Sequence, residues 1–204
     1  MKKLVLLIIV LLLAGLLIYK LRSGKEENKA APPDQALKIN KNTGVFNTAF
    51  SEMMSAYFNL KDALVEWDTI KADQAAYILA QRADSLPVGT IRGDSNIVNT
   101  ARSLAASIGG DAQGLVGEGD IVQKRRALNI LTDELYNLVR TVRYDGEIIY
   151  HVRCPMAFND SEEGYWLSNN PKIINPYLGD KHPVYKAKMI GCGEISDSLD
   201  FTKK

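Results

Sequence analysis

Cysteine and histidine, which often bind metals or take part in catalysis, are scarce in this chain. Its 204 residues include two cysteines and two histidines. Both cysteines, Cys154 and Cys192, lie in the last quarter, and both histidines, His151 and His182, lie near the C-terminus. No Ser/His/Asp arrangement marks a catalytic site. The glycine-rich stretch at residues 110–119 lacks the spacing of a phosphate-binding P-loop. We therefore expect a binding protein rather than an enzyme.

The chain also lacks an excess of charge of either sign. It contains 25 Lys and Arg against 24 Asp and Glu, and its net charge is +1. Without a basic surface there is no long-range attraction to a phosphate backbone, so nucleic acid is not an expected partner. The length remaining after the N-terminal residues 1–43 is typical of one domain.

A long apolar run occurs at one place, between Leu4 and Tyr19. Lysines flank it on both sides, and its length of about 16 residues is close to the lower limit for a spanning helix. Residues 1–22 are therefore predicted to be a membrane anchor helix or a signal segment, and an uncleaved anchor is favoured because no small-x-small cleavage site follows. Residues 23–43, with Ala30-Ala31-Pro32-Pro33, are typical of a flexible linker. We expect an inner-membrane anchor with the domain facing the periplasm, or export if the segment is cleaved.

The segment 44–198 is predicted to be a mainly α domain. The first helix is carried by apolar residues at helical spacing, which are Phe46, Phe50, Met53, Tyr57, Leu60, Leu64 and Trp67. Asp68 is predicted to cap a second helix, which ends at Pro87. Asp94 or Ser95 is predicted to cap a third helix, which ends at Gly109-Gly110. Residues 110–119 are predicted to form a loop. Asp120 caps a fourth helix extending to Val142, and short loops between amphipathic helices favour an up-down four-helix bundle.

The helical pattern stops at Tyr144-Asp145-Gly146, and residues 147–154 alternate as a β-strand does. This strand opens a small β and loop segment, residues 147–195. A regular strand would place Tyr150, Val152 and Cys154 on one face and His151 on the other.

Each cysteine of this segment has a methionine close by in the sequence. Met156 follows Cys154 by two positions, and Met189 precedes Cys192 by three. Two thiolates and two thioethers are a donor set that selects the soft ions Cu(I) or Ag(I). His182 could complete such a site, although an exposed loop histidine is the favoured interpretation.

The cysteines also allow other interpretations. In an oxidising compartment Cys154 and Cys192 could form a disulfide, which would close a loop of about 38 residues and contribute roughly 3 to 4 kcal/mol. They could also be buried, inert thiols. Trp166 and Tyr177 are predicted to be core residues beneath the site, and Asn175 to initiate a turn through its side-chain amide.

The motifs CPMAF, GYWLS, NPYLG and MIGCGEI resemble those of domain-of-unknown-function family 3347, a bacterial domain that occurs behind a signal or anchor and on periplasmic adaptors of Cus-type copper and silver efflux pumps. The resemblance extends over about residues 45–198. It implies extracytoplasmic heavy-metal handling, with a metal efflux adaptor or another periplasmic protein as partner. It favours a metal site at Cys154, Met156, Met189 and Cys192 over a structural disulfide in a helical interaction module.

Overall fold

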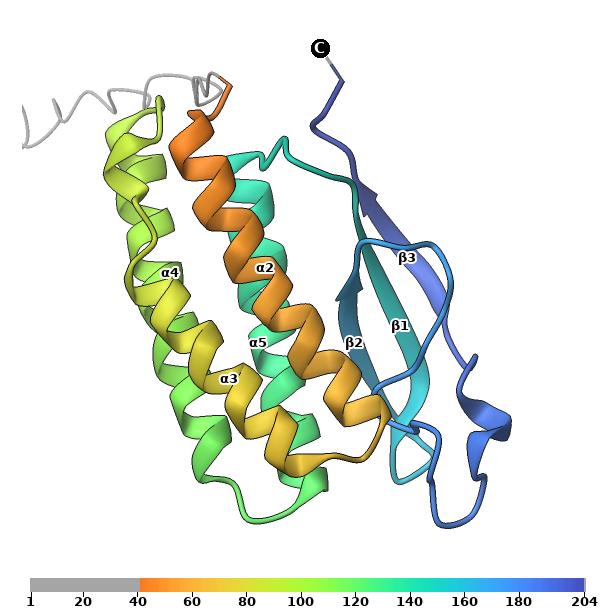
Figure 1. Ribbon diagram of the computed structural model, residues 1–204. Coiled ribbons are helices and arrows are strands. Elements are labelled where there is room, and N and C mark those ends of the chain that lie inside the picture. Colours follow the sequence, from red (N-terminus) through yellow and green to blue (C-terminus); the bar gives the residue numbers. More distant parts are fainter. Residues whose placement is uncertain (1–40, 204) are drawn as a thin grey trace, which may run out of the picture. The chain divides into compact units, whose positions relative to one another are not determined.

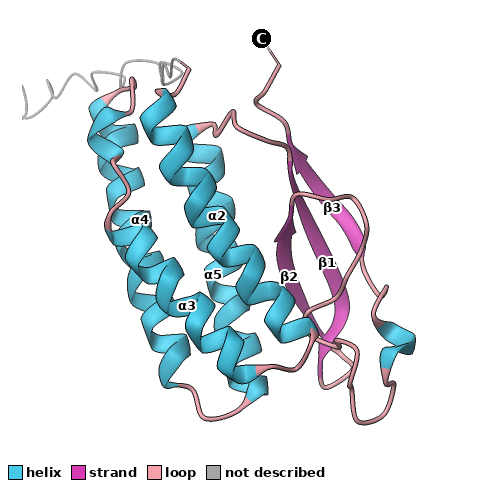
Figure 2. Ribbon diagram, in the orientation of Figure 1, coloured by secondary structure: helices cyan, strands magenta, loops and turns pink. Residues whose placement is uncertain are grey.

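The structure is a computed structural model that describes residues 41–203. Within this range four α-helices come first, which are α2 (Gly44–Val65), α3 (Thr69–Asp84), α4 (Ser95–Gly117) and α5 (Ile121–Val142). The strands that follow are β1 (Ile149–Phe158), β2 (Glu162–Ser168) and β3 (Glu194–Leu199), and the short 3-10 helices are η1 (Val88–Thr90) and η2 (Ala187–Met189). The described part is therefore mainly helical with a small C-terminal sheet, as the sequence predicts (Figures 1 and 2).

Each of these helices begins at a residue whose side chain accepts a hydrogen bond from the backbone. Thr43 accepts from Phe46, Asp68 from Lys71, Asp94 from Asn96, and Asp120 from Val122 and Gln123. Such N-caps stabilise a helix by about 1 kcal/mol each. The three aspartate caps confirm the helix starts that the sequence predicts.

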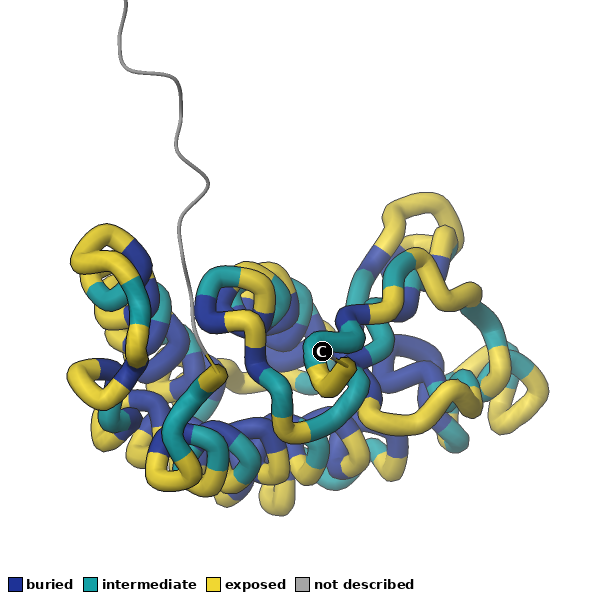
Figure 3. The backbone as a smooth tube through the Cα atoms, turned by 90° about the horizontal axis from the view of Figure 1, so that it is seen from above, coloured by how far each residue is buried: buried dark blue, intermediate teal, exposed yellow. Residues whose placement is uncertain are grey.

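Consecutive helices pack against each other, α2 on α3, α3 on α4 and α4 on α5. They run alternately down and up in Figure 1, which is the order of an up-down bundle. Buried positions lie on the sides of the helices that face one another, and exposed positions lie on the outer sides and at the turns (Figure 3). The amphipathic stripes read from the sequence therefore form the core.

One prediction for the helical part is wrong. Residues 110–117, predicted to belong to a loop, continue α4 without a break. Ile108, Ala112 and Leu115 extend the buried stripe through the two glycines. Gly109 is needed for packing rather than for a helix end, because a Cβ there would lie 2.5 Å from the Asp84 carboxylate of α3.

The first helix is shorter than predicted, ending at Val65 rather than at Trp67. The backbone of Trp67 is left-handed, with φ of 59°, and the N–H of Asp68 returns to the carbonyl of Ala63 at 2.9 Å. Such a turn satisfies carbonyls at the end of a helix. It also redirects Trp67, whose Nε1 donates to the carbonyl of Leu178 at 3.2 Å.

The strands form an antiparallel sheet in the order β2-β1-β3. β1 is longer than predicted, since it continues through Pro155 to Phe158, and its register with β2 is irregular between Cys154 and Phe158. A second irregularity lies opposite β3, between His151 and Val152. Proline cannot donate a ladder hydrogen bond, and an irregular stretch is where it is tolerated.

The outer edge of β2 is bonded by side chains rather than by another strand. Tyr57 of α2 accepts a hydrogen bond from the N–H of Leu167 at 3.0 Å. Asn129 of α5 accepts one from the N–H of Tyr165 at 2.7 Å. These contacts satisfy donors that an exposed edge would leave free, and they fix the sheet against the bundle.

The two faces of the sheet have different neighbours. On one face His151 stacks between Tyr136 of α5 and Tyr165, with ring centroids 4.3 and 4.9 Å apart. On the other face Trp166 contacts Tyr177, and a Cβ on Gly193 would lie 2.8 Å from the Trp166 ring. The sheet therefore lies between α5 and residues 169–193, which we call the C-terminal loop.

The predicted anchor, residues 1–22, and nearly all of the predicted linker, residues 23–43, lie outside the described residues. Among residues 41–203 no helix has the length and hydropathy needed to span a membrane.

Candidate functional site

Cys154 is held in the middle strand of the sheet. It lies in β1 opposite Gly164 of β2, and its side chain is completely buried. A Cβ on Gly164 would lie 2.9 Å from the Tyr177 ring, so the absence of a side chain at this position lets Tyr177 cover the strand. Cys154 therefore faces the C-terminal loop, and His151 lies on the opposite face as predicted.

Cys192 is positioned by a turn of the C-terminal loop. Its N–H donates to the carbonyl of Met189 at 2.9 Å. Its own carbonyl accepts a hydrogen bond from the side-chain amide of Asn175 at 2.7 Å. The N–H of Asn175 in turn donates to the carbonyl of Ile190 at 2.8 Å. These two bonds attach Asn175 to the turn that carries the Cys192 thiol.

Asn175 has a larger role than the sequence suggests. It is fully buried, and its Oδ1 accepts from the N–H groups of Tyr177 and Leu178 at 2.8 and 3.0 Å. This local turn was predicted. The bond from Nδ2 to Cys192 was not, because nothing in the sequence pairs an asparagine with a carbonyl 17 residues away.

The structure brings the two thiols together. The sulfur atoms of Cys154 and Cys192, which we call the thiol pair, are 3.5 Å apart, and both cysteines are free. A disulfide would require a distance of about 2.05 Å. Burial, together with the neighbouring Cys154 thiol, raises the pKa of Cys192 to about 11. Cys192 is therefore protonated at neutral pH, and binding of a cation would have to release its proton.

The two methionines lie on the same segments as the thiols. Met156 is in the irregular part of β1 and Met189 ends η2, and both are partly buried against the core. Among the hydrogen bonds of residues 41–203, each thiol has the other as its partner, and none joins a thiol to a methionine sulfur. The arrangement thus supplies two adjacent thiols with two thioethers on the same strand and turn.

His182 occupies a different environment. Its ring stacks on Tyr185 at 4.9 Å and meets the edge of Trp67 at 6.1 Å. It lines a cavity whose walls include neither a cysteine nor a methionine. Within residues 41–203 no three His, Cys, Asp or Glu side chains form a cluster suited to a metal ion.

The aromatic residues beneath the thiol pair form the expected core. Trp166 is completely buried and Tyr177 is 2 % exposed, and their rings meet edge to face at 6.1 Å. The hydroxyl of Tyr177 donates to the carbonyl of Tyr165. Trp166 and Tyr177 are therefore packing residues, as the sequence predicts.

Comparison with known proteins supports the resemblance over the helices. Residues 53–146 match the family model described as "Protein of unknown function (DUF3347)". This segment runs from α2 to the turn after α5, and it ends before β1, so the thiol pair and the four C-terminal motifs lie outside the match. No curated protein and no solved structure shows a significant match to the chain.

Proposed function

We propose that this chain is an extracytoplasmic module that binds a soft metal ion, Cu(I) or Ag(I), through the thiols of Cys154 and Cys192. The observation that carries this proposal is the sulfur separation of 3.5 Å. With metal–sulfur bonds of about 2.3 Å, two thiolates on one ion lie roughly 3.8 Å apart at a tetrahedral angle and about 4.6 Å apart when collinear. A small outward movement of one sulfur is enough to admit an ion.

Burial of the thiol pair supports a soft ion over a hard one. Cys154 is completely buried, and the carboxylates nearest to it in the strands, Glu163 and Glu194, are each paired with Arg153. Thiolates and thioethers prefer polarizable d10 ions, while Mg²⁺ and Ca²⁺ need oxygen ligands. Met156 and Met189 are the proposed neutral donors, each brought in by a small shift of the strand or turn that carries it. His182 has no part in this ligand set.

The proposed setting follows from the resemblance and from residues 1–22. We propose an N-terminal anchor in the inner membrane, a domain that faces the periplasm, and a heavy-metal efflux adaptor or other periplasmic protein as partner. The function is sequestration or delivery of the ion, with no catalytic step.

A second candidate rests on the same sulfur distance. Loss of two electrons and two protons to an oxidant would join Cys154 and Cys192 in a disulfide. Because the cysteines are 38 positions apart, this bond would stabilise the domain by about 3 to 4 kcal/mol. A disulfide has no thiolate to offer, so the chain would then be a helical interaction module without a metal.

The deciding experiment is a Cu(I) competition titration combined with thiol counting, on full-length protein purified without reductant. The metal proposal requires two free thiols and one tightly bound Cu(I) per chain. Undetectable thiols together with no Cu(I) binding would establish the disulfide. Tight Cu(I) binding by protein with both thiols oxidised would refute the ligand set itself.

A further inference from the structure

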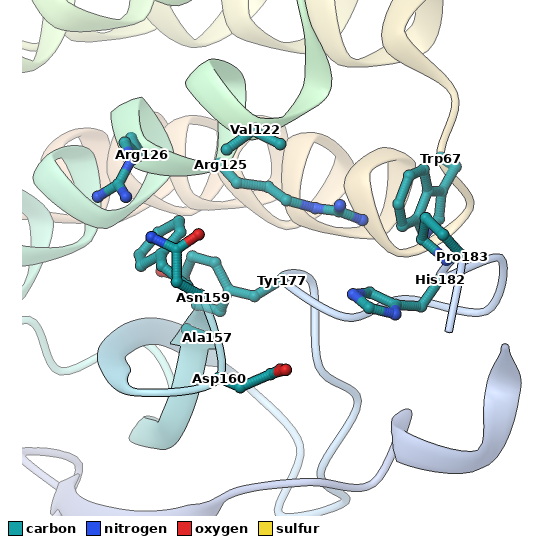
Figure 4. A pocket seen from close by; sticks show the side chains of 11 residues that line it. Trp67, Val122, Arg125, Arg126, Ala157, Asn159, Asp160, Tyr177, His182 and Pro183 are labelled. Carbon is teal, nitrogen blue, oxygen red and sulfur yellow. The ribbon is translucent and has the colours of Figure 1, made fainter. Parts of the chain in front are cut away.

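A cavity of about 280 Å³ lies away from the thiol pair, at the end of the bundle where α2 stops and α5 begins. Figure 4 shows its walls, with Trp67 after α2, Val122 and Arg125 at the start of α5, and Asp160 and His182 from the β1–β2 turn and the C-terminal loop. Segments from four parts of the chain thus line one cavity, which is open to solvent on one side.

Arg125 contributes a buried positive charge to this cavity. The residue is 3 % exposed. Its Nε donates to the carbonyl of Pro176 at 2.8 Å, and its Nη2 to the carbonyl of Leu64 at 3.0 Å. The guanidinium carbon lies 4.1 Å from the centroid of the Trp67 ring. These contacts hold the group in one orientation.

The charge of Arg125 has no anionic partner among residues 41–203. None of their ion pairs includes it. A guanidinium has five N–H groups, and the two bonds to carbonyls leave three of them, including both on Nη1. Burial lowers the pKa of Arg125 to about 10, so it is still protonated at neutral pH. Buried charges are normally paired, so this one is suited to an anion from outside.

His182 supplies a second donor. Its Nδ1 accepts hydrogen bonds from the N–H groups of Val184 and Tyr185, at 3.3 and 3.2 Å. A nitrogen that accepts carries no proton, so the proton of the neutral ring is on Nε2. Burial and the charge of Arg125 lower the pKa of His182, which keeps it neutral at neutral pH. The ring points into the cavity (Figure 4).

The remaining walls limit the kind of anion. Arg126, the other arginine of the cavity, is paired with Glu162 at 3.2 Å, so Arg125 provides one unpaired positive charge. Asp160 lies across the cavity from it (Figure 4) and disfavours a second negative charge on the ligand. Trp67 and Phe158 offer aromatic surface. The volume is near the lower end of the range for small-molecule sites.

We propose that this cavity binds a small organic monocarboxylate. The guanidinium of Arg125 and the Nε2–H of His182 donate hydrogen bonds to the carboxylate. The apolar part of the molecule packs against Trp67 and Phe158. A carboxylate matches the planar fork of free N–H groups that a guanidinium presents. The walls of this cavity include none of the proposed metal ligands, and the site needs no metal.

Calorimetric titration of the full-length protein with benzoate tests the ligand class. Benzamide, phthalate and inorganic phosphate are the comparison probes, because they lack the charge, carry a second charge, or lack the aromatic ring. We expect saturable benzoate binding and at least about ten-fold weaker binding of each comparison probe, as for loss of one charge-assisted hydrogen bond. Absence of benzoate binding, or phosphate binding as tight as benzoate, would overturn the proposal.

Two variants on the surface of α5 test the location. Val122 and Ile130 are similar aliphatic residues, 49 % and 53 % exposed, and Val122 lines the cavity while Ile130 does not. Val122→Phe should weaken benzoate binding at least about ten-fold by filling the space, and Ile130→Phe should leave it unchanged. His182→Phe, which keeps a ring beside Tyr185 but loses the donor, should also weaken it about ten-fold. Equal affinity in Val122→Phe and Ile130→Phe would place the ligand elsewhere and refute the site.

Discussion

Replacing Asn175 with alanine should both unfold the C-terminal loop more easily and loosen the thiol pair. The side chain is fully buried, and its truncation removes three hydrogen bonds, from Tyr177, from Leu178 and to Cys192. Tyr177 and Leu178 are themselves buried, so their N–H groups would be left without a partner. At about 1 to 3 kcal/mol for each of these two groups, the expected loss is roughly 2 to 6 kcal/mol.

The assay is equilibrium urea unfolding followed by tryptophan fluorescence. Trp67 and Trp166 both contact the C-terminal loop, so the fluorescence reports on the affected region. Asn170→Ala is the matched control, because its Oδ1 accepts a hydrogen bond from the N–H of Lys172 in the same loop but is exposed to water. A loss below about 1 kcal/mol for Asn175→Ala, or a loss equal to that of Asn170→Ala, would refute the role given to Asn175.

Three further predictions concern the thiol pair, the bundle and one carboxyl group. Cys154→Ser should lower Cu(I) affinity by orders of magnitude in a competition titration with little effect on the apo fold, whereas a loss of about 2 to 5 kcal/mol with unchanged metal binding would identify a disulfide. Leu135→Asp puts a charge at a fully buried position of α5 and should cost several kcal/mol. An unchanged melting temperature would contradict this helix packing. Burial, with the charges of neighbouring carboxylates, raises the pKa of Glu134 to about 7, above its usual 4.5. The folded state therefore binds more protons between these values, and stability falls as pH rises through this window. Glu134→Gln should flatten this dependence in unfolding titrations from pH 4 to 8, and an unaltered slope would exclude Glu134 as its source.

The helices could be predicted from the sequence because their signals are local. A stripe such as Leu128, Leu131, Leu135 and Leu138 marks the buried face of α5 directly, and all four residues are fully buried. The aspartates before α3, α4 and α5 bond the first turn within three positions of the cap. Periodicity and capping do not depend on the rest of the fold.

The loop prediction at Gly109 and Gly110 is wrong because α4 continues through both glycines, and Gly109 serves helix packing and not a helix end. Glycine is the most common residue after a helix end, which is why the loop was predicted. In the structure Gly109 lets α4 approach Asp84 of α3, and no local pattern distinguishes these two uses.

The outer strands were missed because their patterns are weak. β3 (Glu194–Leu199) has four exposed residues of six, so it carries little apolar alternation. β2 pairs along one edge with β1, while its other edge depends on Tyr57 and Asn129 from helices more than 35 positions away. Such long-range partners are not visible in a single sequence.

The positions of the thiol pair and of the cavity lined by Arg125 depend on one short segment of the C-terminal loop. Asn175 holds the turn of Cys192, and the carbonyl of the next residue, Pro176, accepts from Arg125. One bond connects Asn175 to the thiol pair's turn, and the other connects Pro176 to the arginine of the cavity. A displacement of residues 175–176 would therefore move the walls of both sites. Asn175→Ala is therefore expected to weaken the binding of both benzoate and Cu(I). Val122 lines the cavity, whose walls include neither cysteine, so Val122→Phe should leave Cu(I) binding intact. A stable Asn175→Ala protein with benzoate affinity equal to that of the parent would show that the two sites are positioned independently.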